Sequence, residues 1–196
     1  MLHPRCVCAL GLLGLLGVSA ARAGDIDPPM GPVQGTMKTL DAIEPRDILK
    51  TLASSPDAVH LITQPGQYVL TEDISVPSGK SGIVVELPPG VEGDVSIDLN
   101  GFSIVGQPGS LHAVHCKAGG GGGGRTYTLM SSFPTSWRSM GGSGLMVDGG
   151  GRVWVSGVRA ENCAGDGFHI ENTAECVLSI SASGCGGDGV EAILCD

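Results

Sequence analysis

The stretch that decides the fold is GSGLMV at 142–147, which recurs as GDGFHI at 165–170 and as GDGVEA at 187–192. The three copies are spaced 23 and 22 residues apart. A fixed period in the low twenties, with glycine turns and short apolar alternations, is typical of one supersecondary unit stacked on itself. Because such a unit is too short to hold a crossover helix, the repeat predicts one turn of a parallel β-solenoid.

Other positions recur with a spacing of 22 residues. The pairs are Val155 and Val177, Val158 and Ile180, Ala160 and Ala182, Cys163 and Cys185, and Asp166 and Asp188. We therefore expect each pair to be stacked in adjacent coils, about 4.8 Å apart. That spacing would bring Cys163 and Cys185 within disulfide range, and a stack of two free thiols is the alternative.

Residues 1–23 have the features of a secretory signal peptide. Arg5 supplies the charged start, residues 7–18 are apolar and rich in leucine, and Ala21-Arg22-Ala23 fits the small-x-small cleavage rule. The apolar stretch is too short for a membrane span. The sequence therefore predicts a secreted protein, either extracellular or at the periplasm or cell surface.

The charge of the chain argues against nucleic acid as a partner. The whole chain has 11 basic and 20 acidic residues, and cleavage after residue 23 would leave 9 and 20, a formal charge of −11. Binding of nucleic acid needs clustered Lys and Arg. Five cysteines would remain after cleavage, so at least one thiol would be free or paired with another chain.

Residues 24–58 show no strand periodicity and are predicted to be an N-terminal capping segment, with short helical turns at 39–43 and 47–52. The first β-helix coils are predicted at 59–114. Their clearest strand is VSIDL at 95–99, where the alternation places residues 95, 97 and 99 inside. The pair Asn100-Gly101 then favours a sharp corner.

Several of these segments resemble a known group of proteins. The runs ITQPGQYVLTEDI (62–74), SGIVVE (81–86) and SIDLNGF (96–102), the GDG coils and the leading TMKTLDAIEPR (36–46) are similar to secreted bacterial right-handed parallel β-helix repeat proteins of the pectin-lyase-like superfamily. The resemblance implies an all-β, right-handed parallel β-helix of about four or five coils with a short N-terminal cap. It is specific for fold and weak for activity, because this superfamily includes lyases, hydrolases, epimerases and proteins of unknown role.

Residues 115–141 interrupt the repeat and are predicted to be a glycine-rich irregular insertion. They include six consecutive glycines at 119–124, and the spacing from Leu111 to Leu145 exceeds one coil by 11 or 12 residues. We expect a flexible loop that projects from one corner. Its aromatic residues, Tyr127, Phe133 and Trp137, would suit a surface for a ligand or partner, because long loops on rigid scaffolds often carry function.

The repeat coils at 142–196 are followed by no closing helix or polar coil in this sequence. An uncapped parallel edge recruits other strands. The sequence therefore predicts self-association through an open C-terminal coil.

The GDG coils supply the candidate site residues. If Phe168 and Ile170 point inward with Leu145, Val147, Val190 and Ala192, then His169 and Glu191 point outward and are candidates for ligand binding. Asp166 and Asp188 are the catalytic candidates, because two carboxylates about 5 Å apart suit a retaining glycosidase. An oxygen-rich cluster also suits Ca²⁺, which would be the cofactor of such a site. The simpler interpretation is structural, because Asp between glycines commonly hydrogen-bonds its own turn.

Two further groups contain residue types that bind ligands or metals. Trp154 lies between two valines and is expected to face outward, where it would stack on a sugar ring or pack under a neighbouring loop. The segment HAVHC at 112–116 contains metal-ligand residue types, but strand spacing places His112 and Cys116 on one face and His115 on the other. No metal site is predicted there.

Two functions follow from this sequence. The first is a non-catalytic extracellular module that binds a polysaccharide or cell-surface glycan or has a structural role. The second is a polysaccharide lyase or glycoside hydrolase. Lyases of the superfamily use a positioned Arg or Lys as base, and the repeat coils offer only Arg152 and Arg159, which match no family motif. We therefore favour the non-catalytic module.

Overall fold

The computed structural model describes residues 46–117 and 125–193. The predicted signal peptide at 1–23, most of the predicted cap, the glycine run at 119–124 and Cys195 lie outside these residues. Within the two described ranges the regular secondary structure is all strand except for one short 3-10 helix, η1 (Leu49–Thr51). No helix in these ranges is long and apolar enough to cross a membrane.

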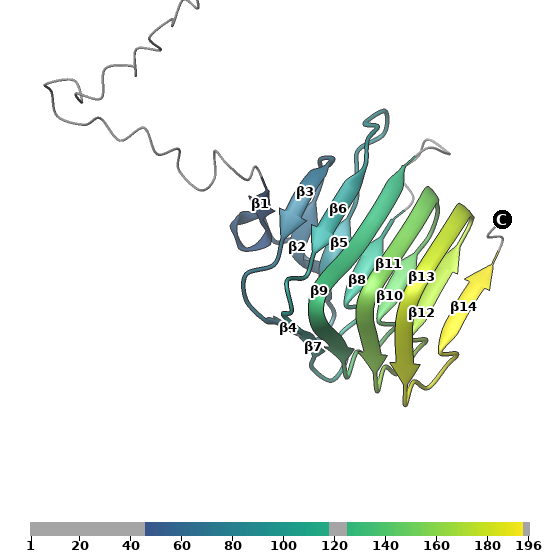
Figure 1. Ribbon diagram of the computed structural model, residues 1–196. Coiled ribbons are helices and arrows are strands. Elements are labelled where there is room, and N and C mark those ends of the chain that lie inside the picture. Colours follow the sequence, from purple (N-terminus) through teal and green to yellow (C-terminus); the bar gives the residue numbers. More distant parts are fainter. Residues whose placement is uncertain (1–45, 118–124, 194–196) are drawn as a thin grey trace, which may run out of the picture. The chain divides into compact units, whose positions relative to one another are not determined.

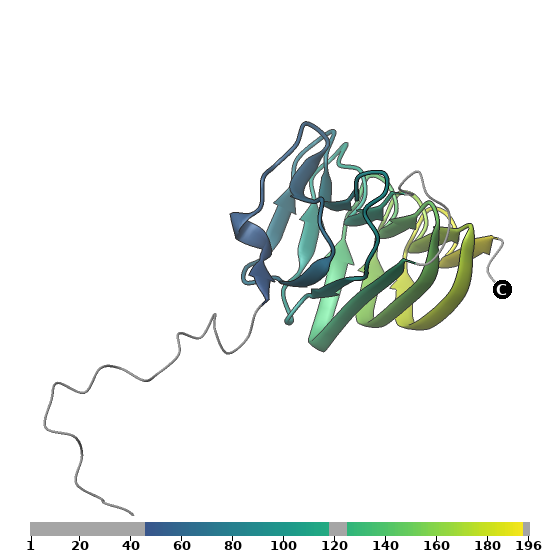
Figure 2. The ribbon, with the colours of Figure 1, turned by 90° about the horizontal axis from the view of Figure 1, so that it is seen from above.

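The strands form two parallel sheets that wind as a β-helix (Figures 1 and 2), which confirms the predicted all-β solenoid. Sheet B contains six strands: β2 (Ala58–Ile62), β5 (Ser81–Val85), β8 (Val114–Cys116), β10 (Leu145–Val147), β12 (Phe168–Glu171) and β14 (Val190–Ile193). Sheet A contains eight: β1 (Asp47–Ile48), β3 (Gly66–Val69), β4 (Ile74–Val76), β6 (Val95–Asp98), β7 (Ile104–Gly106), β9 (Thr126–Arg138), β11 (Gly150–Glu161) and β13 (Thr173–Ser183).

Equivalent residues of sheet B define the coil lengths. Along the row His60, Ile83, Val114, Leu145, Phe168 and Val190, successive partners are 23, 31, 31, 23 and 22 residues apart. These six strands delimit five turns, within the predicted four or five. The two longer coils lie in the middle of the described chain, which explains why the repeat is visible only in its last part.

The inward rows of the GDG coils match the predicted register. Leu145, Phe168, Val147 and Ile170 are all fully buried. The register pairs Phe168 with Val190 and Ile170 with Ala192. Val190 is nevertheless 46% exposed, because no strand of the described residues covers β14 on its far side. The inward residues of β10 and β12, which have a coil on both sides, are fully buried by contrast.

The predicted irregular insertion at 115–141 differs from the structure. Cys116 ends β8, and residues 126–138 form β9, which pairs with β6 and β7 on one side and β11 on the other. Tyr127 and Trp137 are 2% and 0% exposed and belong to the core, so they are not a ligand surface. Phe133 is exposed. The prediction of an irregular loop is wrong because residues 131–134 of β9 lie opposite only one residue of β11. These extra residues lengthen the coil, so the repeat spacing is not visible in the sequence.

One predicted stacking pair is out of register. Val155 pairs with Leu178, and Val177 pairs with the outward-facing Trp154. The shift arises at Gly157, which has no partner in β13 and adopts a left-handed φ of 74°. A Cβ atom there would lie 2.4 Å from the Ser131 carbonyl oxygen, so glycine is required. Beyond this bulge the predicted pairs Val158–Ile180 and Ala160–Ala182 are confirmed.

Cys163 and Cys185 are both free thiols in the structure. The two thiols are neighbours in the structure, without a bond between them. Burial, together with the neighbouring Cys185, raises the pKa of the Cys163 thiol to about 11. The thiol therefore stays protonated at neutral pH and behaves as a small apolar group.

Candidate functional site

A ladder of hydrogen bonds links the coils at the position of the GDG aspartates. At the corner before sheet B, the backbone N–H of each residue donates to the side chain of its counterpart in the preceding coil. The bonds run from His112 to Ser81 Oγ (3.3 Å), from Ser143 to His112 Nδ1 (3.1 Å), from Asp166 to Ser143 Oγ (3.3 Å) and from Asp188 to Asp166 Oδ1 (2.8 Å). Asp166 thus joins two coils, whereas the sequence predicted a bond within its own turn.

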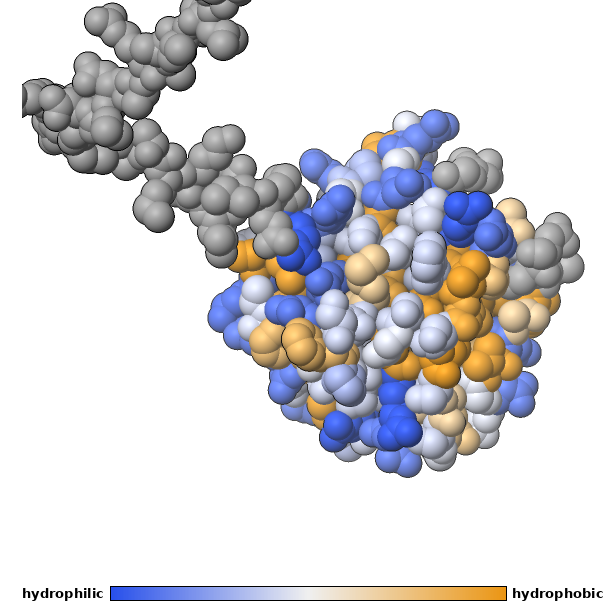
Figure 3. Space-filling view, viewed as in Figure 1, coloured by the Kyte–Doolittle hydropathy of each residue, from blue (hydrophilic) through white to orange (hydrophobic). Residues whose placement is uncertain are grey.

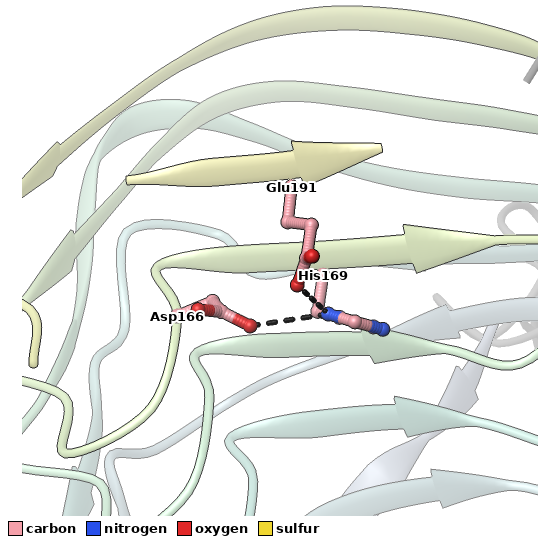
Figure 4. Close-up of side chains that lie close together, drawn as sticks. All are labelled: Asp166, His169 and Glu191. Carbon is pink, nitrogen blue, oxygen red and sulfur yellow. Dashed lines mark hydrogen bonds and ion pairs between the residues drawn. The ribbon is translucent and has the colours of Figure 1, made fainter. Parts of the chain in front are cut away.

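The second oxygen of Asp166 takes part in a cluster on the outer face of sheet B (Figure 4). His169 Nδ1 lies 3.1 Å from Asp166 Oδ2 and 2.7 Å from Glu191 Oε2. The two carboxylates reach the same ring nitrogen from different elements, Glu191 from β14 and Asp166 from the turn before β12. The predicted alignment of His169 with Glu191 is confirmed by the strand register.

The environment of His169 favours its charged form. Its side chain is only 16% exposed, less than the sequence led us to expect. Burial by itself lowers the pKa of the imidazole, but the hydrogen bonds and negative charges of Asp166 and Glu191 outweigh it, so the pKa of His169 is raised. Glu171 adds a third carboxylate, 3.9 Å from Nε2.

The two catalytic candidates do not form the carboxylate pair of this cluster. Asp166 is paired through His169 with Glu191, and Asp188 contributes its backbone N–H to the ladder. A retaining glycosidase needs two carboxyl groups that flank the substrate bond. Here both carboxylates bond one imidazole nitrogen, which suits charge pairing or metal binding better than acid–base work on a sugar.

A second imidazole–carboxylate pair lies on the same face. His115 Nε2 is 2.7 Å from Asp148 Oδ2, and the His112 ring meets the His115 ring edge-on at 5.2 Å. Cys116 is fully buried in the core, so it shares no ligand site with His112. Sequence reasoning missed Asp148, because the 31-residue coil hid the alignment of HAVHC with the next coil.

Sheet A, on the other side of the β-helix from this cluster, carries a groove where its long strands β9, β11 and β13 bend. The groove has a volume of about 550 Å³, and six of its fourteen lining residues carry small hydroxyl side chains. Figure 3 shows strongly hydrophilic side chains near the lower ends of these strands and apolar surface beside them. The hydroxyl-bearing residues of the groove are Ser131, Ser132, Thr135, Ser136, Ser179 and Ser181.

Two arginines and one glutamate set the charge of the groove. Arg138 Nε and Arg159 Nη1 each lie 3.2 Å from one oxygen of Glu161. Arg138 also donates to Ser136 Oγ at 2.6 Å, and Arg159 donates to Ser181 Oγ at 3.2 Å. Each guanidinium carries five donors, so both keep donors for a ligand. The groove is locally cationic although the whole chain is acidic.

One exposed aromatic ring lines this groove, and a second precedes the groove residues on β11. Phe133 lines it and is 62% exposed. Trp154 is 51% exposed, between the buried Val153 and Val155, which confirms its predicted outward orientation. It lies three residues before the groove residue Gly157, a distance of about 10 Å along a strand.

Comparisons with known proteins leave the family open. No protein-family model matches the chain, and no curated protein or solved structure shows significant similarity to it. A fold by itself does not specify activity. The function is therefore argued from the groove and the cluster themselves.

Proposed function

We propose that the protein is an exported, non-catalytic carbohydrate-binding module of the pectin-lyase-like type, and that the sheet A groove binds a polysaccharide containing uronic acids. The observation that carries this proposal is the pairing of two arginines with a single glutamate in a groove rich in hydroxyl groups. Guanidinium groups bind carboxylates in a two-pronged geometry. Hydroxyl side chains suit the many hydroxyls of a sugar. The signal-like residues 1–23 support export.

The aromatic residues support a sugar ligand in the same region. Exposed aromatic rings offer apolar faces, and Trp154 presents a large one on a rigid strand. A polysaccharide chain that runs along the bent strands would contact the arginines and reach the Trp154 ring. A module with only structural function would not need cations and aromatic rings on one face.

A polysaccharide lyase or glycoside hydrolase is the alternative function. The observation on its side is the gathering of titratable groups around His169, although their shared imidazole nitrogen suits charge pairing or metal binding better than acid–base work on a sugar. They lie on sheet B, on the other sheet from the groove, so groove binding and this cluster do not together form one catalytic centre. Product assays separate the two functions: a lyase forms unsaturated uronate ends, a hydrolase forms new reducing ends, and a binding module forms neither.

Binding to oligogalacturonate should weaken about tenfold when Trp154 is replaced by alanine and when Arg159 is replaced by glutamine, because each change removes one contact worth about 1.4 kcal/mol. Isothermal titration calorimetry measures both affinities. The matched control is Lys50→Gln, which removes an exposed cation on η1 that is paired with Glu72, away from the groove.

Two outcomes would contradict this proposal. If a neutral glucan oligomer bound with the same affinity as oligogalacturonate, the arginines would not be recognising the carboxylates of the sugar. Unchanged affinity of both groove variants, with the wild type still binding, would place the sugar site elsewhere.

A further inference from the structure

The geometry points to a metal site formed by Asp166, His169 and Glu191. Its expected ion is Zn²⁺ or another divalent ion of the first transition series. This inference is independent of the proposed groove, since it concerns the outer face of sheet B. Failure of either one leaves the other standing.

The three side chains already lie at near-ligand separations. Their candidate ligand atoms are within 4.8 Å of one another, with Nδ1 of His169 at 2.7 Å from Glu191 and 3.1 Å from Asp166. Zinc binds imidazole nitrogen and carboxylate oxygen at about 2.1 Å, so tetrahedral ligands lie roughly 3.4 Å apart. Small side-chain rotations reach this geometry without movement of the strands.

The backbone holds these ligands in place. His169 and Glu191 are direct register partners in β12 and β14, so their side chains leave the sheet side by side. The N–H of Asp188 fixes Asp166 Oδ1 and leaves Oδ2 directed at His169. Glu171 faces the other ring nitrogen at 3.9 Å, where a carboxylate fixes the ring of a metal-bound histidine.

The donor set selects the class of ion. Calcium requires six to eight oxygen ligands, and this cluster offers one nitrogen and two carboxylates. Imidazole with carboxylates suits zinc and its neighbours in the transition series. Binding would exchange the Nδ1 proton for the ion and release that proton to solvent. Three protein ligands would leave at least one coordination position for water.

The His115–Asp148 pair provides the internal comparison. It has the same residue chemistry on the same sheet face but only two groups. Met146 separates His115 from His169 in the register. If three ligands are required, the group of Asp166, His169 and Glu191 will bind the ion and the His115–Asp148 pair will not.

The test is a titration of the untagged full chain with ZnCl₂ in competition with a chromophoric chelator, and with CoCl₂ by absorption spectroscopy. We expect one Zn²⁺ per chain. Glu191→Gln and His169→Gln should each weaken binding by at least about 100-fold, since loss of an outer partner alone costs 10–100-fold. His115→Gln should leave the affinity unchanged, and Ca²⁺ should not compete. Circular dichroism checks that each variant is folded.

Three results would overturn the site. One is the absence of stoichiometric Zn²⁺ binding at micromolar concentration. Another is an affinity that neither Glu191→Gln nor His169→Gln changes. The third is a sulfur-to-cobalt charge-transfer band, which would place the ion at one or more of the cysteines instead, four of which are free thiols in the described residues.

Discussion

Replacing Phe168 with alanine will lower the free energy of unfolding by about 3–5 kcal/mol, the usual cost of removing a buried phenylalanine ring. Phe168 is fully buried in the inward row of sheet B. Its ring lies 5.6 Å from that of Trp137, which comes from β9 on the other sheet. The truncation would open a cavity between the two sheets, and the strands on either side cannot close it because their hydrogen bonds fix the coil spacing.

Urea denaturation followed by circular dichroism measures this effect. Phe133→Ala is the matched control, because it removes the same ring from a position that is 62% exposed. Its expected cost is within about 0.5 kcal/mol. If both variants lost the same stability, or if Phe168→Ala lost less than about 1 kcal/mol, the inward register of the GDG coils would be wrong.

The register around Phe168 could be predicted from sequence because adjacent coils there have nearly equal length. When the period is constant, the same residue types recur at the same corner, and the alternation between corners assigns inside and outside. The inference failed at Val155 and Val177, where one added residue, Gly157, shifts the pairing. A bulge changes the register without changing the apolar pattern, so a sequence comparison does not reveal it.

The strand β9 shows the second limit. Its aromatic residues Tyr127 and Trp137 are core residues, yet their segment lies in a 31-residue coil and has extra residues at the bend. A solenoid tolerates added residues at corners because only the strands are stacked. Local composition at such a corner resembles a loop, and the strand itself becomes evident only through its hydrogen-bonded neighbours.

The candidate sites divide in the same way. The alignment of His169 with Glu191 follows from the constant period of the last coils, and it was predicted. The contact between His169 and Asp166 depends on the side-chain orientation of Asp166 at its turn, and the repeat spacing does not predict that orientation. The sheet A groove arises from the shared bend of three long strands, so its arginines carry no sequence motif.

Acidification from pH 6.5 to about pH 4 will destabilise the fold, and His112 will account for about 2 kcal/mol of the loss. Burial, with a further contribution from the neighbouring His115, lowers the pKa of His112 from 6.5 to about 4. The unfolded chain therefore binds a proton on this residue in a pH range where the folded chain does not, so stability falls as the pH falls. This loss of about 2 kcal/mol is smaller than the whole pKa shift of His112 would give, because the ring is partly exposed and solvent screens its charge.

The hydrogen-bond ladder also predicts that protonation of His112 destabilises the fold. Nδ1 of His112 accepts the N–H of Ser143, so a proton on that nitrogen would break a bond between coils. His60 acts with the same sign, because burial lowers its pKa. His169 acts with the opposite sign: its pKa is raised, so its contribution is complete below pH 6.5 and is lost as the pH rises through the folded value.

Urea titrations at half-unit steps of pH from 7.5 to 4, on the wild type and two variants, separate these contributions. His112→Asn keeps a side-chain acceptor for Ser143 but does not titrate, so its stability should fall less steeply with acid than that of the wild type. His169→Gln should lack the gain in stability that His169 gives the wild type as the pH falls from 7.5 to 6.5, and its curve should run parallel to that of the wild type below pH 6.5, where this contribution is already complete. Parallel curves for all three proteins would mean that neither histidine differs in pKa between the folded and unfolded chains, and the acid sensitivity would then belong to the carboxylates.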